Sequence, residues 1–165
     1  MKALFYLLLC SLVFFSCQKN TEEQEQQSDT SNARLAKSQA EIDDGKILAY
    51  LDETSLKAEV TKDGLYYIIE EAGGEEKPSL SSVVTVHYRG TLLDGKEFDS
   101  SIGGKPLRIR LAQLVQGWQK GIPLIGKGGK ITLIVPSELG YGVASTPAFG
   151  PNSVLRFDIE LLDFE

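Results

Sequence analysis

The chain is poor in the residue types that most often carry out covalent chemistry. Of its 165 residues, two are cysteine and one is histidine, and both cysteines, Cys10 and Cys17, lie in the first 17 residues. The rest of the chain has no thiol, which excludes disulfides, thiolate metal sites and a cysteine nucleophile there. His87 alone cannot form a multi-histidine metal site, and alternation in its strand places it on the water-facing side. We therefore expect neither a metal nor a cofactor.

Basic side chains are also few. Lysine and arginine number 17 against 23 acidic residues, the net charge is −6, and no basic run occurs. Binding to nucleic acid needs clustered lysine and arginine to neutralise phosphates, so this class of protein is excluded. With 42% hydrophobic and 24% charged residues, the chain is typical of one globular domain with a single core.

The longest apolar run extends from Ala3 to Phe15. It is too short to span a bilayer, which needs about 20 residues. With Lys2 before it and Cys17 soon after it, the run resembles a bacterial lipoprotein signal over residues 1–16, in which Cys17 carries the lipid. Phe14 departs from that pattern, and an ordinary signal or an uncleaved anchor is the alternative. The expectation is a domain lipid-anchored to a bacterial membrane and facing the periplasm or the cell exterior.

A polar tether follows the signal segment. Residues 18–32 contain no apolar side chain, so they cannot bury enough surface to offset the entropy lost on ordering. We expect residues 17–35 to be a lipidated flexible tether.

Residues 36–60 contain the signals of a short helix. Ser38 followed by Glu41 matches a capping box, and three apolar residues recur at near-helical spacing: Ile42, Leu48 and Leu51. This apolar face is short for a dimer interface, so we favour a monomer with the helix packed on the domain. A dimer through residues 38–53 is the alternative.

Residues 61–165 have the alternating pattern of β-strands. GLYYIIE is a run of residues that favour strands, polar and apolar side chains alternate in SVVTVHYRG, LRIRL and VLRFDIELL, and GKITLIV places Ile131, Leu133 and Val135 on one face. Asp94-Gly95 is a hairpin signal. Only LAQLVQGWQKGI reads as helical. The predicted fold class is α+β, a twisted antiparallel sheet of about five strands wrapped around one short α-helix, with one face of the sheet exposed to water.

Aromatic residues lie where these elements begin, end or meet. Such side chains either fill a core, which is the more frequent case, or form the walls of an apolar pocket. Those in question are Tyr88, Phe98, Trp118, Tyr141, Phe149 and Phe157.

Four motifs then carry a family resemblance: VTVHYRGTLLDGKEFDSS, LVQGWQKGI, VPSELGYG and GPNSVLRFDIELL. In this order they resemble the FKBP-type peptidyl-prolyl cis-trans isomerases over residues 61–165. The resemblance implies that the domain accelerates rotation about Xaa-Pro bonds of exported proteins. It would bind the twisted amide in an apolar aromatic pocket, with no covalent intermediate. The alternative is a prolyl-peptide-binding chaperone or assembly lipoprotein with weak catalysis. Proline-containing polypeptides are the expected partners.

The resemblance also implies roles for individual residues. Trp118 would form the floor under the proline ring, Tyr141 would donate its hydroxyl to the substrate backbone, and Asp99 would orient or polarise the twisting amide. The backbone N–H of Val115 would donate to a substrate carbonyl. Other substrate-binding residues would be Tyr88, Phe98, Leu107, Leu114, Phe149 and Phe157.

The sequence departs from the family pattern at several of these positions. Leu107 stands where many members have phenylalanine, and the Phe149-Gly150-Pro151 segment replaces a usual Ile-Pro-Pro loop. The arginine that pairs with the aspartate in some members is missing. We therefore expect a thinner wall, a looser loop and a less rigidly held Asp99.

Overall fold

A computed structural model describes residues 37–165. The predicted signal segment and tether, with Cys17, lie outside the described residues. Ser38–Glu165 forms one compact unit. No helix within residues 37–165 has both the length and the apolar character needed to cross a membrane.

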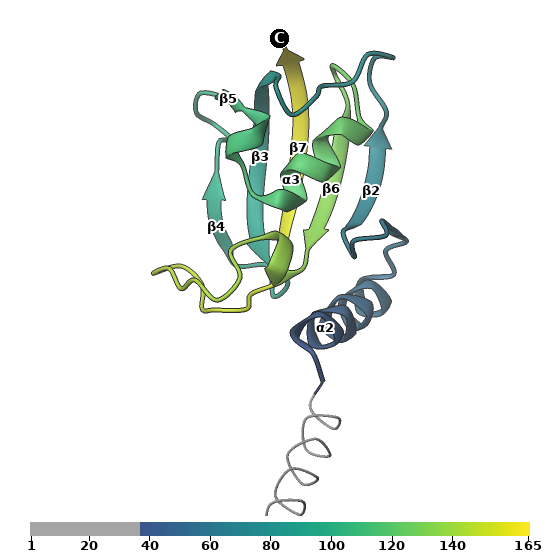
Figure 1. The fold of residues 1–165 in the computed structure, drawn as a ribbon, viewed down its shortest axis with the longest axis vertical. Helices are drawn as coiled ribbons and strands as arrows, with labels where there is room; N and C mark the ends of the chain where they lie inside the picture. Colours follow the sequence, from purple (N-terminus) through teal and green to yellow (C-terminus); the bar gives the residue numbers. More distant parts are fainter. Residues whose placement is uncertain (1–36) are drawn as a thin grey trace, which may run out of the picture. The chain divides into compact units, whose positions relative to one another are not determined.

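The described chain combines one longer helix and short helical segments with a sheet in which β3 and β7 are the longest strands (Figure 1). The helices are α2 (Gln39–Thr54) and α3 (Gln116–Gly121), with short 3-10 segments η1 (Leu111–Gln113), η2 (Ile122–Leu124) and η3 (Ser137–Leu139). The strands are β1 (Glu59–Val60), β2 (Tyr66–Glu71), β3 (Val83–Leu92), β4 (Glu97–Ser100), β5 (Leu107–Arg110), β6 (Lys130–Val135) and β7 (Leu155–Phe164).

The strands form one antiparallel sheet in the order β1-β2-β6-β7-β3-β4, and β5 pairs with the remaining part of β3. The predicted α+β fold class is confirmed. The sheet has seven strands instead of about five. The count is higher because it includes β1, which is only two residues long, and because β4 and β5 are two separate strands along one edge of β3. The predicted central helix is split into η1, α3 and η2.

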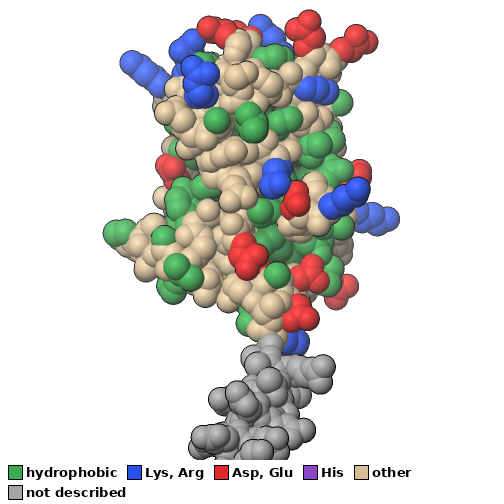
Figure 2. Space-filling model, in the orientation of Figure 1, with side chains coloured by type: hydrophobic (Ala, Val, Ile, Leu, Met, Phe, Trp, Pro, Cys, Tyr) green, Lys and Arg blue, Asp and Glu red, His purple; other side chains and the backbone are tan. Residues whose placement is uncertain are grey.

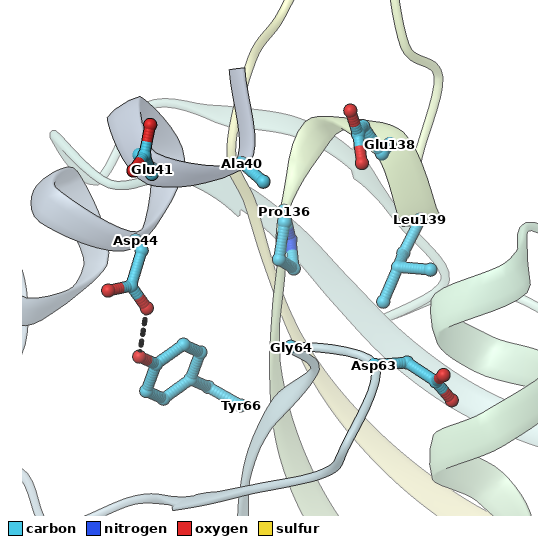
Figure 3. A pocket seen from close by; sticks show the side chains of 9 residues that line it. All are labelled: Ala40, Glu41, Asp44, Asp63, Gly64, Tyr66, Pro136, Glu138 and Leu139. Atoms are coloured by element: carbon cyan, nitrogen blue, oxygen red, sulfur yellow. Dashed lines mark hydrogen bonds between the residues drawn. The ribbon is translucent and has the colours of Figure 1, made fainter. Parts of the chain in front are cut away.

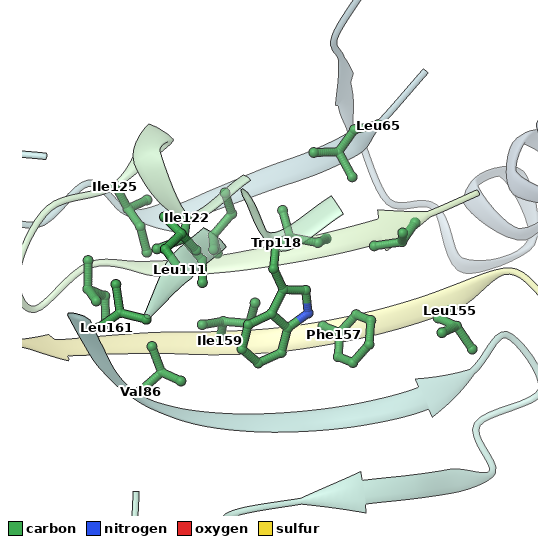
Figure 4. Close-up of a cluster of buried hydrophobic side chains, with 14 of the residues drawn as sticks. Leu65, Val86, Leu111, Trp118, Ile122, Ile125, Leu155, Phe157, Ile159 and Leu161 are labelled. Atoms are coloured by element: carbon green, nitrogen blue, oxygen red, sulfur yellow. The ribbon is translucent and has the colours of Figure 1, made fainter. Parts of the chain in front are cut away.

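The core lies between α3 and one face of the sheet (Figures 1 and 4). Alternation along β3 holds, since Val84 and Val86 are fully buried. Two glycines let α3 approach β6 closely. A Cβ on Gly117 would lie 2.6 Å from Val135, and one on Gly121 would lie 2.5 Å from Leu133. This close contact fixes the helix, and with it Trp118, over the sheet.

The other face of the sheet is only partly exposed to water, contrary to the prediction. Tyr66 and Ile134 are paired across β2 and β6, and they pack with Ile47 of α2 and with Val154 in a second buried cluster. The sequence pattern of β6 did not predict this cover, because Ile134 is the one apolar residue on the strand face opposite Ile131, Leu133 and Val135, and a single apolar residue does not indicate what packs there.

Helix α2 begins at the predicted capping box, with Glu41 N–H donating to the Ser38 side chain and Ser38 N–H donating to the Glu41 carboxylate. Its packing on the domain is also confirmed. The predicted apolar face was wrong at two of its three residues, since Ile42 and Leu48 are 39% and 51% exposed, whereas Leu51 packs on the second cluster as predicted. Ile47 and Asp43 are the fully buried residues of α2. The contact face turns toward η3 because the Asp43 carboxylate has a hydrogen-bond donor there.

Candidate functional site

The six aromatic residues singled out in the sequence form one continuous cluster, called here the six-ring cluster. Each ring contacts the next at centroid distances between 5.0 and 5.6 Å, mostly edge to face. Such geometries are favourable for aromatic pairs. Along the cluster the order is Tyr88, Trp118, Phe157, Phe98, Phe149 and Tyr141.

Exposure changes along the six-ring cluster. Trp118 and Phe157 are buried at 3% and 4% exposure, whereas Tyr88 and Phe98 are half-buried and Tyr141 is 46% exposed. The cluster therefore continues the core to the surface. A ligand at this surface would meet rings that the core already holds in place.

The indole of Trp118 has a buried N–H with no acceptor among the described residues. Figure 4 shows the indole nitrogen on the side of the ring nearer Phe157. The two rings are nearly perpendicular, at 87° and 5.2 Å.

Asp99 enters this surface through an irregularity of β4. Phe98 and Asp99 are neighbours, so strict alternation would place them on opposite faces. The pairing shifts between Gly90–Asp99 and Thr91–Glu97, which leaves one extra residue in β4, a β-bulge. As a result Phe98 packs against Phe149 and Phe157 of the six-ring cluster, and the neighbouring Asp99 binds Tyr88 of the same cluster.

The Asp99 carboxylate accepts a hydrogen bond of 2.6 Å from the Tyr88 hydroxyl. The pKa of Tyr88 is raised well above its usual range, first by burial, then by this hydrogen bond and the charge of Asp99, with a smaller effect from Tyr141. Ser101 holds the same tyrosine, since its Oγ accepts from the Tyr88 N–H at 2.9 Å. Among residues 37–165 no arginine pairs with Asp99, and Tyr88 takes part in holding its carboxylate.

The start of α3 presents a free backbone donor. Val115 is the N-cap residue, and no described residue accepts from its N–H, as is usual at a helix start. The side chain of Gln119 fixes this turn by donating to the carbonyls of Leu114 at 2.7 Å and Ala112 at 3.2 Å. Leu114 and Val115 both pack on the core beside the rings. Gln119 was not foreseen from the sequence.

Leu107 lies on the same face of the sheet but outside the ring contacts. It pairs directly with Val86 and packs on the core, and Tyr88 is two residues further along β3 on that face. The structure thus places Leu107 beside the six-ring cluster.

Two further residues hold the cluster together and were not foreseen from the sequence. A Cβ on Gly90 would lie 2.7 Å from Phe98 Cζ and 3.1 Å from Phe157, so glycine is required for this ring packing. Lys96 donates to the Ala148 carbonyl at 3.1 Å and ties the β3–β4 hairpin to the loop that carries Phe149. A glycine inside a strand is the one sequence signal that could have revealed Gly90.

A second concave region lies elsewhere on the domain (Figure 3). It has a volume of about 300 Å³ and is lined by Ala40, Glu41, Asp44, Asp63, Gly64, Tyr66, Pro136, Glu138 and Leu139. Acidic side chains gather over α2 on the face drawn in Figure 2. The Asp44 carboxylate accepts from the Tyr66 hydroxyl, and burial, this bond and the Asp44 charge raise the pKa of Tyr66 to about 12. Within residues 37–165 no group of three or more acidic, histidine or cysteine side chains could bind a metal ion.

The six-ring cluster offers apolar surface, one carboxylate and a few hydrogen-bond donors. Ser101 Oγ lies 3.1 Å from His87 Nδ1, but it accepts the Tyr88 N–H, and His87 alternates to the face of β3 opposite Tyr88. The arrangement of the described residues can therefore act by shape, desolvation and hydrogen bonding. A sheet wrapped around a short helix, with this aromatic cluster continuing from the core to the surface, defines the class of fold to which the domain belongs.

The chain belongs to the FKBP-type peptidyl-prolyl cis-trans isomerase family. The family model described as FKBP-type peptidyl-prolyl cis-trans isomerase matches residues 74–162, more than half of the chain. The crystal structure of FkpA from Escherichia coli resembles this chain with a TM-score of 0.68 and 39% identity, covering 89% of this chain and 70% of that one. The crystal structure of AtFKBP13 does so with a TM-score of 0.60 and 35% identity, covering 65% and 98%.

Two relatives are FKBP-type peptidyl-prolyl cis-trans isomerases named FkpA. The Escherichia coli K12 protein is 54% identical over 101 residues, which cover 61% of this chain and 37% of that protein. The Aeromonas hydrophila protein is 39% identical over 147 residues, covering 85% and 55%. The chain thus spans between about two fifths and somewhat more than half of these relatives.

The lipid-anchored localisation predicted from Cys17 is contradicted by these relatives. They carry the name of FkpA isomerases, and that name describes no lipoprotein. The prediction was wrong because it depended on the few residues before Cys17, where Phe14 already departed from the lipoprotein pattern. Such a short pattern constrains little.

Proposed function

We propose that the chain is a peptidyl-prolyl cis-trans isomerase that acts on proline-containing polypeptides. The observation that carries this proposal is the six-ring cluster at the surface, with the Asp99 carboxylate held at 2.6 Å by Tyr88. The family to which the chain belongs supports the same activity. The alternative of a weakly catalytic binding chaperone has no observation in its favour.

The reaction needs little chemistry from the protein. Rotation about an Xaa-Pro bond is slow because resonance gives the C–N bond partial double-bond character, with a barrier of about 18–20 kcal/mol. A site that binds the twisted amide more tightly than the planar forms lowers this barrier. A dry aromatic surface favours the twisted form, since water stabilises the charge-separated planar resonance form.

Each part of the site has a task in this proposal. The proline ring rests on Trp118, and the other rings of the cluster enclose it. The Val115 N–H and the Tyr141 hydroxyl donate to substrate carbonyls and hold the backbone on either side of the bond. Asp99 orients the amide as it twists. Leu107 and Leu114 complete the apolar wall.

Exchange spectroscopy by NMR on a short Xaa-Pro peptide tests the proposal. Uncatalysed exchange takes tens to hundreds of seconds, and we expect micromolar full-length protein to bring it into the range of about a second or faster. Asp99→Ala should lower kcat/KM by about tenfold or more, because an oriented carboxylate is lost from the site.

Glu97→Gln is the matched control. Glu97 lies on the same strand and is exposed, but its carboxylate pairs with Arg89 at 2.7 Å instead of facing the rings. This variant should keep the wild-type rate. No acceleration by the wild-type protein would overturn the proposed function, and equal losses in the two variants would overturn the role of Asp99.

A further inference from the structure

A buried carboxylate of α2 lies away from the six-ring cluster and has no part in the mechanism above. Asp43 is fully buried. Its Oδ2 accepts from the Ser137 N–H at 2.8 Å, and its Oδ1 accepts from Gln39 Nε2 at 2.7 Å, with Lys46 Nζ at 3.4 Å. A buried charge is retained at a cost unless it is paired and hydrogen-bonded, and this carboxylate meets both conditions.

The contact with Ser137 supplies a cap that the local sequence lacks. Ser137 is the first residue of η3, and the N-cap residue before it is Pro136, whose side chain has no acceptor atom. First-turn N–H groups of a helix need an acceptor from outside. Asp43, 94 residues earlier in the chain, provides that acceptor.

The segment capped in this way leads directly to the loop of Tyr141. The Ser137 carbonyl accepts from the Gly140 N–H at 3.0 Å and from the Gly142 N–H at 2.7 Å, the residues on either side of Tyr141. Ser137 therefore binds the backbone on both sides of Tyr141, and the N–H of Ser137 is in turn bound by Asp43. Tyr141 itself is 46% exposed and makes one ring contact, with Phe149.

We propose that Asp43 is a positioning residue for the substrate-binding site, because through Ser137 it fixes the loop that presents the Tyr141 hydroxyl. The inference rests on the proposed function for its kinetic consequence, but the loop coupling can be measured without catalysis. Helix α2 is then part of the machinery that orders the site and not only a cover for the sheet.

The charge state of Asp43 agrees with this role. Burial alone would raise the pKa of Asp43, but the hydrogen bonds from Ser137 and Gln39 and the charge of Lys46 outweigh it, and the net shift is downward. The carboxylate is therefore ionised at neutral pH and is a strong acceptor for the Ser137 N–H.

Amide hydrogen exchange on the full chain tests the coupling. In Asp43→Ala we expect the Gly140 and Gly142 amides to exchange about tenfold faster or more. Asp43→Asn keeps an oxygen acceptor and should restore most of the protection. Asp44→Asn is the matched control, since Asp44 lies on the same helix but binds Tyr66 of β2. Unchanged protection in Asp43→Ala, or an equal loss in Asp44→Asn, would overturn the proposal.

Kinetics on the same proteins separate positioning from a general loss of stability. Asp43→Ala should raise KM by about three- to tenfold with a smaller change in kcat, because it misplaces a binding group. Added to Tyr141→Phe, the same change should have little further effect, since the hydroxyl it positions is absent. Fully additive effects would overturn the role. If the wild-type protein shows no isomerase activity, the proposed function fails while the hydrogen-exchange result still decides whether Asp43 fixes the loop.

Discussion

Replacing Gly90 with alanine tests whether the six-ring cluster is as tightly packed as the structure indicates. The new Cβ would lie 2.7 and 2.9 Å from two carbons of Phe98 and 3.1 Å from Phe157. Favourable carbon contacts lie at about 3.5–4.0 Å, so the rings must move by roughly 1 Å. Gly90 lies inside β3, where alanine loses less backbone entropy on folding than glycine. This difference alone would stabilise the protein by about 0.5–1 kcal/mol.

The net effect follows from these two terms. Overpacking in a core costs about 1–3 kcal/mol, so we expect Gly90→Ala to lower the free energy of unfolding by about 1–2 kcal/mol. A displacement of roughly 1 Å at a binding site can cost about a hundredfold in rate, so kcat/KM should fall by about tenfold to a hundredfold. Urea unfolding and NMR exchange of an Xaa-Pro peptide measure the two effects.

Gly45→Ala is the control for this experiment. Gly45 lies inside α2, and a Cβ there would have no atom within 4 Å. The change should stabilise the protein by about 1 kcal/mol because alanine is the better helix former, and activity should not change. If Gly90→Ala behaves like Gly45→Ala in both assays, the close ring packing and its link to activity are refuted.

Three other changes have defined outcomes. Tyr88→Phe removes the donor to Asp99, and kcat/KM should fall by about tenfold, whereas the free energy of unfolding should fall by only about 1 kcal/mol. Tyr66 has its pKa raised from 10.0 to about 12, so the stability that it contributes is complete below pH 10 and should be lost as pH rises toward 12; Tyr66→Phe should remove this loss in urea titrations. The pKa of Asp43 is lowered from 3.8, so its contribution is present above that value and should be lost as pH falls through the lower folded-state pKa, which Asp43→Asn should abolish.

Each of these outcomes has a clear contrary result. Wild-type activity in Tyr88→Phe would mean that the orientation of the Asp99 carboxylate has no bearing on the reaction. An alkaline stability profile that is the same in Tyr66→Phe would assign the loss to other groups. An acid profile unchanged by Asp43→Asn would show that this buried carboxylate does not control acid stability.

Local patterns of the sequence predicted the strands and the members of the aromatic cluster. Alternation placed Val84 and Val86 inside, and Asp94-Gly95 forms the predicted turn, with the Lys96 N–H bound to Asp94. These features depend on residues close in the chain, so periodicity and turn chemistry suffice to find them.

Features that depend on distant partners escaped the sequence. The sequence predicted Ile42 on the buried face of α2, but Ile42 is 39% exposed, whereas Asp43 is fully buried. The hydrogen-bond donor of Asp43 is a backbone N–H of Ser137, which no sequence pattern connects with it. The β-bulge that brings Asp99 to the same site as Phe98 is an irregularity of pairing, and alternation cannot predict it. The resemblance to the family named the site residues, and their mutual contacts came from the structure.

The central claim is that the six-ring cluster binds the prolyl peptide and that binding there speeds rotation. An NMR titration of the ¹⁵N-labelled full chain with an Xaa-Pro peptide tests it directly, in the same sample in which peptide exchange is measured. We expect the Val115 amide and the Trp118 indole N–H to show the largest shifts, together with accelerated exchange. Accelerated exchange with shifts confined to the groove around Ala40 and Glu138, or no acceleration, would contradict the account.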